Sequence, residues 1–269
     1  MLKSRLCIAF FAFAVGCAPA QKPLTDYVNP MLGTATLWDS VDLGFKPTKR
    51  TWGAEVFPGS SLPNAMVQVS PVTKFHSGAG YQYEDSVIYG FTHTNKGHWN
   101  LCHIPLLPVT GTPTPGDYCS PFSHERESAA PGYYQVFLDR YGVDAQLSST
   151  LRCAFHKYTY PAGAAPAVLA DLQRSNEHVR AWDIRKEGDN VFAGWQQTGE
   201  KMYFYAVANR PVTGIEPVVE GDREVRIVRF GEGDGALELR IGFSFVSEKN
   251  ARENLEAEML GKSFAEVRS

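Results

Sequence analysis

Short segments of alternating apolar and polar residues dominate the second half of the chain. Residues 133–138 place Tyr134, Val136 and Leu138 on one face, and residues 143–148 repeat this period of two. Such alternation is typical of strands that are buried on one face only. Similar segments follow at residues 153–160, 167–172, 179–186, 191–196, 202–208, 224–230 and 236–245.

Upstream, shorter apolar segments at residues 65–69, 87–91 and 102–107 also predict strands. Turn residues separate the segments at short intervals, and residues 187–190 (EGDN) predict a hairpin turn. Almost no stretch before Ser247 has a helical period. The pattern therefore predicts an all-β protein, a large antiparallel β-sandwich.

The pattern changes at Ser247, which is a candidate N-cap for a C-terminal helix. Within residues 248–267, Ala251, Leu255 and Met259 recur at helical spacing. This segment has too little apolar surface to form a domain. We therefore expect an interdomain helix that leads toward a further domain.

Composition and charge narrow the classes of partner. The chain has 269 residues, of which 43% are hydrophobic, and its formal net charge is −3. It is long enough to bury a sizeable core. A slightly acidic chain gives no electrostatic reason to bind nucleic acid or an anionic membrane surface.

The N-terminus has the pattern of an export signal. Lys3 and Arg5 precede an apolar run over residues 7–15 that is too short to span a bilayer. The sequence AVGC then resembles a bacterial lipoprotein cleavage box in which Cys17 carries the lipid. An ordinary signal peptide cut near residues 18–20 is the alternative.

We therefore predict a signal segment over residues 1–17 and a tether over residues 18–24. The protein is expected to be exported as a cell-envelope lipoprotein, in the periplasm or on the outer membrane surface, or otherwise to be secreted. Contact with the membrane would run through the lipid anchor only.

Three cysteines remain outside the signal segment: Cys102, Cys119 and Cys153. Their odd number rules out complete internal pairing, and their spacing does not match a metal site. Buried free thiols are the favoured interpretation, while a disulfide between two of them stays open.

The densest mixture of glycines, aromatic residues and imidazoles lies between residues 52 and 108, which is typical of a site for a polar, ring-shaped ligand. His93 offers a donor and an acceptor for sugar hydroxyls, although a structural histidine at a strand end is the alternative. Trp99 offers an apolar face on which a pyranose ring can pack, or it covers the core.

Further candidates flank these two residues. Glu55 could accept hydrogen bonds from vicinal hydroxyls or add a calcium ligand, although a solvated loop glutamate is the alternative, and Trp52 lies three residues earlier. The spacing of His93, His98 and His103 gives no support for a metal site. No pair of acidic residues in the chain is assigned as catalytic.

Several motifs, in order along the chain, resemble bacterial family 92 glycoside hydrolases, the calcium-dependent exo-α-mannosidases. They are VNPMLGT at 28–34, FPG at 57–59, GFTHT at 90–94 and GFSFVS at 242–247. The resemblance implies an N-terminal β-sandwich over residues 25–247. It also implies that residues 248–269 lead into an (α/α)6 toroid. In this family the toroid carries the catalytic acid and base and most calcium ligands.

The resemblance implies an inverting exo-α-mannosidase in which this part binds an α-mannoside or related glycan. It also implies that the chain is inactive without the (α/α)6 catalytic domain. Asn95 replaces a histidine that is usual in the family, and Glu55 replaces an asparagine. A stand-alone carbohydrate-binding lipoprotein is the alternative function. The predicted substrate-binding residues are Trp52, Glu55, His93, Asn95, His98, Trp99 and Asn100.

Overall fold

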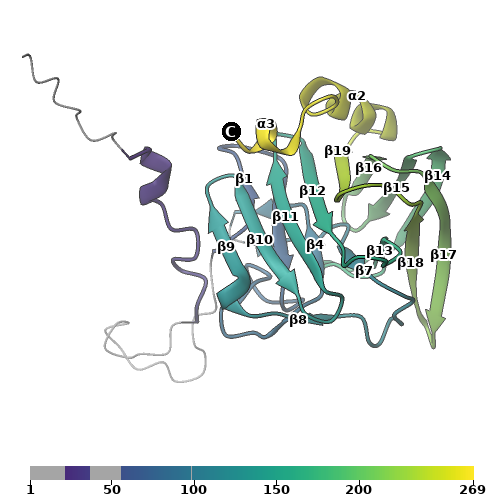
Figure 1. Cartoon of the computed structure of the whole chain (residues 1–269), viewed down its shortest axis with the longest axis horizontal. Helices are drawn as coiled ribbons and strands as arrows, with labels where there is room; N and C mark the ends of the chain where they lie inside the picture. The colour runs from purple at the N-terminus through teal and green to yellow at the C-terminus, as the bar shows by residue number, and fades with distance from the viewer. Residues whose placement is uncertain (1–21, 37–55, 98) are drawn as a thin grey trace, which may run out of the picture.

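The computed structural model describes residues 22–36, 56–97 and 99–269. Two large sheets pack face to face, and every strand pair in them is antiparallel. The predicted all-β sandwich is thereby confirmed (Figure 1). The two sheets share one apolar core.

The seven-stranded sheet runs in the order β1 (Ser60–Ser61), β2 (Gln68–Val72), β4 (Gly90–Thr92), β7 (Leu106–Val109), β13 (Ala167–Ala170), β18 (Arg223–Phe230) and β17 (Val212–Glu220). The eight-stranded sheet runs in the order β14 (Ala181–Gly188), β15 (Val191–Gln197), β16 (Lys201–Ala208), β19 (Leu237–Ser244), β12 (Cys153–Thr159), β11 (Val143–Ser149), β10 (Tyr133–Leu138) and β9 (Glu127–Ala130). Small two-stranded sheets pair β3 (Val87–Ile88) with β8 (Ser120–Pro121), and β5 (Asn95–Lys96) with β6 (Trp99–Asn100). The 3-10 helices are η1 (Leu24–Tyr27) and η2 (His124–Arg126).

The period of two explains which side chains of β10 face the core. Tyr134, Val136 and Leu138 of β10 are fully buried, whereas the intervening Gln135 is half-buried. From β10 onward, every observed strand except β17 begins and ends within about two residues of a predicted segment.

The predicted strand at residues 102–107 is wrong in its first half. Cys102 and Ile104 have φ values of 54° and 53°, in the left-handed region, so the backbone cannot extend there. The regular strand β7 begins only at Leu106. A run of apolar residues predicts burial but not a strand, and here the buried residues lie in an irregular segment.

Strand β17 has no counterpart among the predicted segments. Gly214 follows a register shift in its pairing with β18, and Pro217 lies within the strand. Both residues weaken a strand pattern, and both are tolerated at the edge of a sheet. Strand β17 is such an edge strand.

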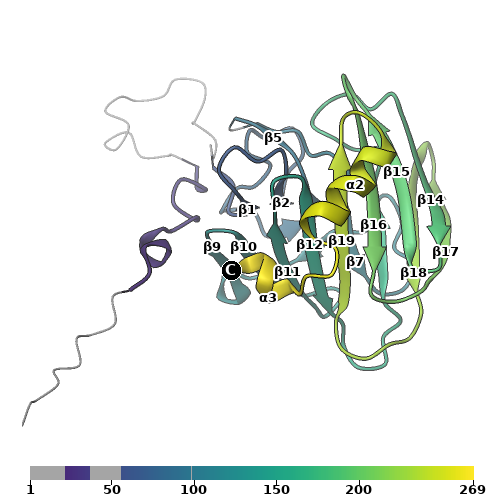
Figure 2. The ribbon, with the colours of Figure 1, turned by 90° about the horizontal axis from the view of Figure 1, so that it is seen from above.

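The C-terminal segment forms two helices that pack on the outer face of the eight-stranded sheet (Figure 2). Helix α2 (Glu248–Glu258) starts where predicted, because the Ser247 side chain accepts a hydrogen bond from the Asn250 backbone. Ala251, Leu255 and Met259 are buried, as their spacing predicts. A Cβ atom on Gly242 would lie 2.1 Å from the Ala251 carbonyl oxygen, so only glycine permits this close approach.

Helix α3 (Phe264–Arg268) follows after Gly261, whose φ of +83° ends the first helical segment. Its N-terminus is closed by a capping box between Ser263 and Glu266. Phe264 packs edge to face on Phe155, which anchors the helix to β12.

The structure also bears on the cysteines and on candidate membrane spans. Cys102, Cys119 and Cys153 are free thiols, and the first and last are buried. Among the residues that the structure describes, no helix combines the length and apolar character that a membrane span requires. The signal segment, including Cys17, lies outside the described residues.

Candidate functional site

Among the described residues of the predicted site, Trp99 on the β5–β6 hairpin has the most exposed aromatic side chain. Lys96 pairs with Trp99 across the hairpin, and Gly97 adopts the positive φ of 61° that the turn requires. Trp99 is 49% exposed. The hairpin thus holds a large apolar surface in contact with solvent.

Trp99 forms one side of a mainly apolar pocket of about 360 Å³, which we call the Trp99 pocket. Of the predicted site residues, the structure brings Trp99 and Asn100 together here. The pocket is lined by His76, Lys96, Trp99, Asn100, Leu101, Asn176 and Glu177.

Glu177 supplies the carboxylate of the pocket, and sequence reasoning missed it. Its Oε2 accepts hydrogen bonds from the Thr198 hydroxyl at 2.7 Å and from His103 Nε2 at 3.1 Å. The Thr198 bond first, and then the His103 bond, lower the pKa of Glu177 below its usual value. The carboxylate is therefore ionised at neutral pH, and it is 41% exposed. Nothing in the local sequence marks Glu177, because its partners lie 21 and 74 residues away.

His103 acts as a neutral hydrogen-bond donor to Glu177. Burial lowers the pKa of His103, and the Glu177 bond only partly offsets this effect. The Thr94 hydroxyl lies 2.9 Å from His103 Nδ1, so it can donate to that nitrogen while Nε2–H points at the carboxylate. The contact is thus a hydrogen bond between a neutral ring and a carboxylate rather than an ion pair.

His93 lies behind the pocket, inside the core. Its ring is fully buried, with Nε2 3.0 Å from His156 Nε2 and Nδ1 3.4 Å from the His103 carbonyl oxygen. Tyr158 donates from its hydroxyl to His156 Nδ1 at 2.5 Å. One set of tautomers satisfies every group: Tyr158 donates to His156, His156 to His93, and His93 to the carbonyl.

Burial lowers the pKa of His93 to about 3 and lowers that of His156 as well, so both rings are neutral. Of the two roles that the sequence left open for His93, the structure gives it the structural one at the end of β4. In this structure its ring does not reach solvent.

The two asparagines of the hairpin differ in how well their amides are satisfied. Asn100 is buried, and its Oδ1 accepts from the Cys102 backbone at 2.7 Å and from the Thr92 hydroxyl at 3.2 Å. Asn100 therefore fixes the chain behind Trp99. Both polar atoms of the Asn95 amide are buried without a partner among the described residues.

Trp52, Glu55 and His98, the other predicted binding residues, lie outside the described residues. Glu127, which was not assigned as catalytic, is a buried structural carboxylate. It accepts hydrogen bonds from Tyr134 at 2.6 Å and from Tyr81 at 2.9 Å, and His124 Nδ1 lies 2.6 Å away.

The resemblance to family 92 implies a calcium ion. Calcium prefers six to eight oxygen ligands, including carboxylates. Within residues 22–36, 56–97 and 99–269, no group of three or more acidic, histidine or cysteine side chains could hold a metal ion.

Residues 27–252 match the model of the glycosyl hydrolase family 92 N-terminal domain. A search of curated proteins found no significant match.

The chain is similar to the solved structure of a family GH92 α-mannosidase from Bacteroides thetaiotaomicron, with 25% identity and a TM-score of 0.78 over 92% of this chain and 36% of that one. A second structure of that enzyme, in complex with mannoimidazole, gives 25% identity and a TM-score of 0.76 over the same shares. A family GH92 inverting mannosidase from the same organism shares the fold, with 22% identity and a TM-score of 0.75 over 93% of this chain and 35% of that one. The chain thus spans about a third of the length of these solved enzymes.

Proposed function

Because the chain belongs to glycosyl hydrolase family 92, in which it matches the N-terminal domain, we propose that it forms one wall of the substrate pocket of an α-mannosidase. In this proposal it also packs against an (α/α)6 catalytic domain. The observation that carries the proposal is the Trp99 pocket, where an exposed indole stands beside an ionised carboxylate.

The pocket offers the two kinds of contact that a mannoside needs. A pyranose ring has an apolar C–H face that packs on an aromatic plane such as Trp99. Its hydroxyls are donors, and Glu177 is an acceptor whose position is fixed by Thr198 and His103. Charged acceptors form stronger hydrogen bonds than neutral ones, so Glu177 would contribute to orientation as well as affinity.

The same pocket does not provide hydrolysis by itself. Inverting hydrolysis needs an acid and a base carboxylate about 6.5–9.5 Å apart. Among the described residues that line the pocket, Glu177 is the single acidic side chain. We therefore propose that this chain binds sugar without hydrolysing it, and that the catalytic pair and calcium belong to the catalytic domain.

Export through the N-terminal segment, with a lipid anchor on Cys17, is part of the proposal and rests on the signal pattern of residues 1–17. Expression of the full chain in a bacterium, followed by fractionation and mass spectrometry, tests it. The wild type should enter the membrane fraction with an acylated Cys17, whereas the Cys17→Ser variant should not. Wild-type protein without acyl chains would contradict the anchor.

The binding role can be tested through the indole N–H signals of the five tryptophans in a ¹⁵N-labelled chain. Titration with methyl α-D-mannopyranoside should shift the Trp99 signal to saturation, with the Trp99→Phe variant providing its assignment. In parallel, 4-nitrophenyl α-D-mannopyranoside with calcium should give no release of nitrophenol above the rate without protein. An unmoved Trp99 signal would contradict sugar binding in the Trp99 pocket. Hydrolysis by the chain alone would contradict the proposal that the catalytic pair belongs to the catalytic domain.

A further inference from the structure

A second pocket opens at one corner of the sandwich, where the edge strands β14 and β17 come side by side (Figure 1). Its volume is about 480 Å³, and we call it the corner pocket. It lies between the start of β14, the turn from β17 to β18 and the loop before β14. The residues that matter for its chemistry are Gln173, Val179, Arg180, Trp182, Asp222 and Arg223.

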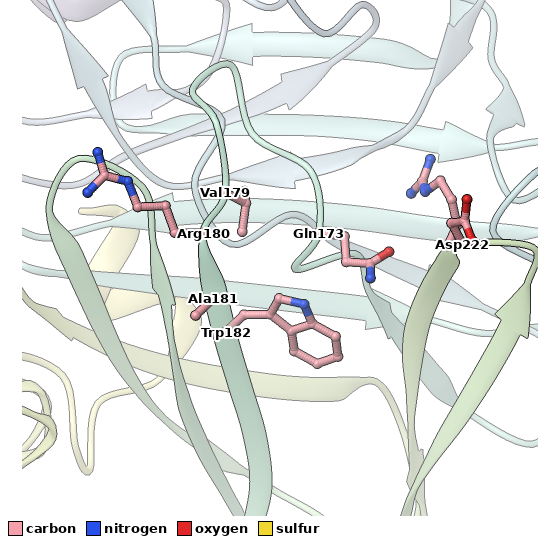
Figure 3. Close-up of a pocket in the computed structure, with 7 residues that line it drawn as sticks. Gln173, Val179, Arg180, Ala181, Trp182 and Asp222 are labelled. Atoms are coloured by element: carbon pink, nitrogen blue, oxygen red, sulfur yellow. The ribbon is translucent and has the colours of Figure 1, made fainter.

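Trp182 provides an aromatic surface in the corner pocket. Figure 3 shows its indole between Arg180 on one side and Asp222 on the other, with the Gln173 amide close by. The Arg226 guanidinium lies 5.3 Å from the Trp182 ring centroid, and its other partner is Glu224 at 2.8 Å. The indole also packs against the main core. These contacts hold the indole ring in a fixed orientation.

Hydrogen-bonding groups also line the corner pocket. Gln173 Oε1 accepts from the Glu224 backbone at 2.7 Å, which orients the amide and leaves its NH₂ group without a partner among the described residues. Arg180 and Asp222 likewise form no ion pair within the described part of the chain. Donors and an acceptor are therefore available around an apolar surface.

The charge balance favours a neutral ligand over an anion. Arg223 is neutralised by Asp171, and Arg226 is neutralised by Glu224. Among the described residues that line the corner pocket, the charges that remain are those of Arg180 and Asp222, and they are opposite in sign. An anion would meet Asp222 unfavourably, whereas a polyhydroxylated ring can donate to Asp222 and accept from Arg180.

The loop that builds the pocket is held rigidly. The Arg180 backbone N–H donates to the Gln197 carbonyl at 2.8 Å. Gln196 Nε2 donates to the carbonyls of Leu172 at 3.0 Å and Arg174 at 2.9 Å. A site that is formed before binding loses less entropy when the ligand arrives.

The corner pocket is separate from the Trp99 pocket. Asn176 and Glu177 of this loop line the Trp99 pocket, whereas Gln173 and Val179 line the corner pocket. The loop therefore stands between two pockets, each with one tryptophan. The two pockets have different lining residues, so each proposal can be tested through its own tryptophan.

We propose that the corner pocket is a second carbohydrate-binding site, which takes a neutral pyranose against Trp182. Gln173 and Arg180 donate to its hydroxyl and ring oxygens, and Asp222 accepts from a hydroxyl. This site goes beyond the proposed pocket wall, because it would hold a glycan away from the place of cleavage.

The experiment follows the Trp182 indole N–H signal, assigned with the Trp182→Phe variant, in the full ¹⁵N-labelled chain. Methyl α-D-mannopyranoside should shift this signal to saturation in the wild type and in Trp99→Ala alike. Arg180→Ala and Asp222→Asn, both at exposed positions, should weaken the affinity read at Trp182 by about tenfold each, as expected for one charge-assisted hydrogen bond. Lys186→Ala, exposed on β14 outside the pocket, is the matched control and should leave that affinity unchanged.

Different results identify which proposal fails. A shift at Trp99 with none at Trp182 overturns the second site and leaves the pocket wall intact. A shift at Trp182 with none at Trp99 supports the second site and contradicts the pocket wall. A Trp182 signal that responds only to methyl β-D-glucuronide overturns the assignment of a neutral ligand.

Discussion

His93 and Trp99 lie six residues apart in one motif-rich stretch, yet their surroundings are opposite. The His93 ring is fully buried, and both of its nitrogens have partners. Trp99 is half exposed beside a carboxylate. The difference teaches that a polar residue in a recognisable motif can hold the frame of a site, while the contact surface comes from its neighbours.

The largest expected effect lies on the buried side of this comparison. His93→Ala removes the acceptor of the His156 Nε2–H and opens a cavity in the core. We expect the free energy of unfolding to fall by about 3–4 kcal/mol, from the lost packing and the unsatisfied buried donor. Urea denaturation monitored by circular dichroism measures it.

The matched control is His178→Ala, at an exposed histidine, which should change the free energy of unfolding by less than about 0.5 kcal/mol. Equal effects of the two substitutions would mean that the buried histidine chain contributes nothing special to stability.

The buried side also predicts a pH dependence. Burial lowers the pKa of His93 to about 3, below the unfolded value of about 6.5. Between these two values the unfolded chain binds a proton that the folded chain does not. The contribution of neutral His93 to the free energy of unfolding is therefore fully present above about pH 6.5. It is lost as the pH falls toward 3, by about 1.4 kcal/mol per pH unit.

Unfolding free energies at pH 7 and pH 5 in the wild type and in His93→Gln test this dependence. At pH 5, His93 alone accounts for about 2 kcal/mol of lost stability. Glutamine does not titrate, so the variant should lose less stability between the two pH values. An identical loss in both proteins would show that His93 is not the titrating group.

Trp99→Ala tests the exposed side. We expect the affinity for methyl α-D-mannopyranoside in the Trp99 pocket to fall at least about tenfold, which is about 1.4 kcal/mol. Stability should change by less than about 0.5 kcal/mol, because the side chain is half exposed. Calorimetric titration and urea denaturation of the same samples give both values, with Trp195→Ala as the control outside the pocket.

The fold was largely predictable because most strands report their burial locally. In β10 the inward residues alternate along the chain, so the sequence carries the period directly. Strand β17 was missed because Gly214 and Pro217 interrupt the pattern at an edge, where pairing with β18 compensates for both. The strand predicted at residues 102–107 was wrong in its first half for the opposite reason, because Ile104 is buried but does not lie in a strand.

The candidate site was predictable only where one segment forms it. Trp99 and Asn100 lie on one hairpin, so local composition indicates them. Glu177 becomes part of the pocket through Thr198 and His103, contacts that only the folded chain creates. The role of His93 depended on His156, which is 63 residues away.

Asn95 gives the smallest expected effect, because its surroundings match neither those of the buried His93 nor those of the half-exposed Trp99. Its amide is buried without a partner among the residues that the structure describes, so Asn95→Ala removes no hydrogen bond seen there and should stabilise the free chain by up to about 1 kcal/mol. The control is Asn100→Ala, which removes the acceptor of the Cys102 backbone N–H and should destabilise the chain by about 1–3 kcal/mol.

If Asn95 is held for a ligand, the gain in stability must come with weaker binding of methyl α-D-mannopyranoside. Stabilisation with unchanged affinity would remove Asn95 from the sugar site, and destabilisation comparable to that of Asn100→Ala would mean that its amide has a partner in solution.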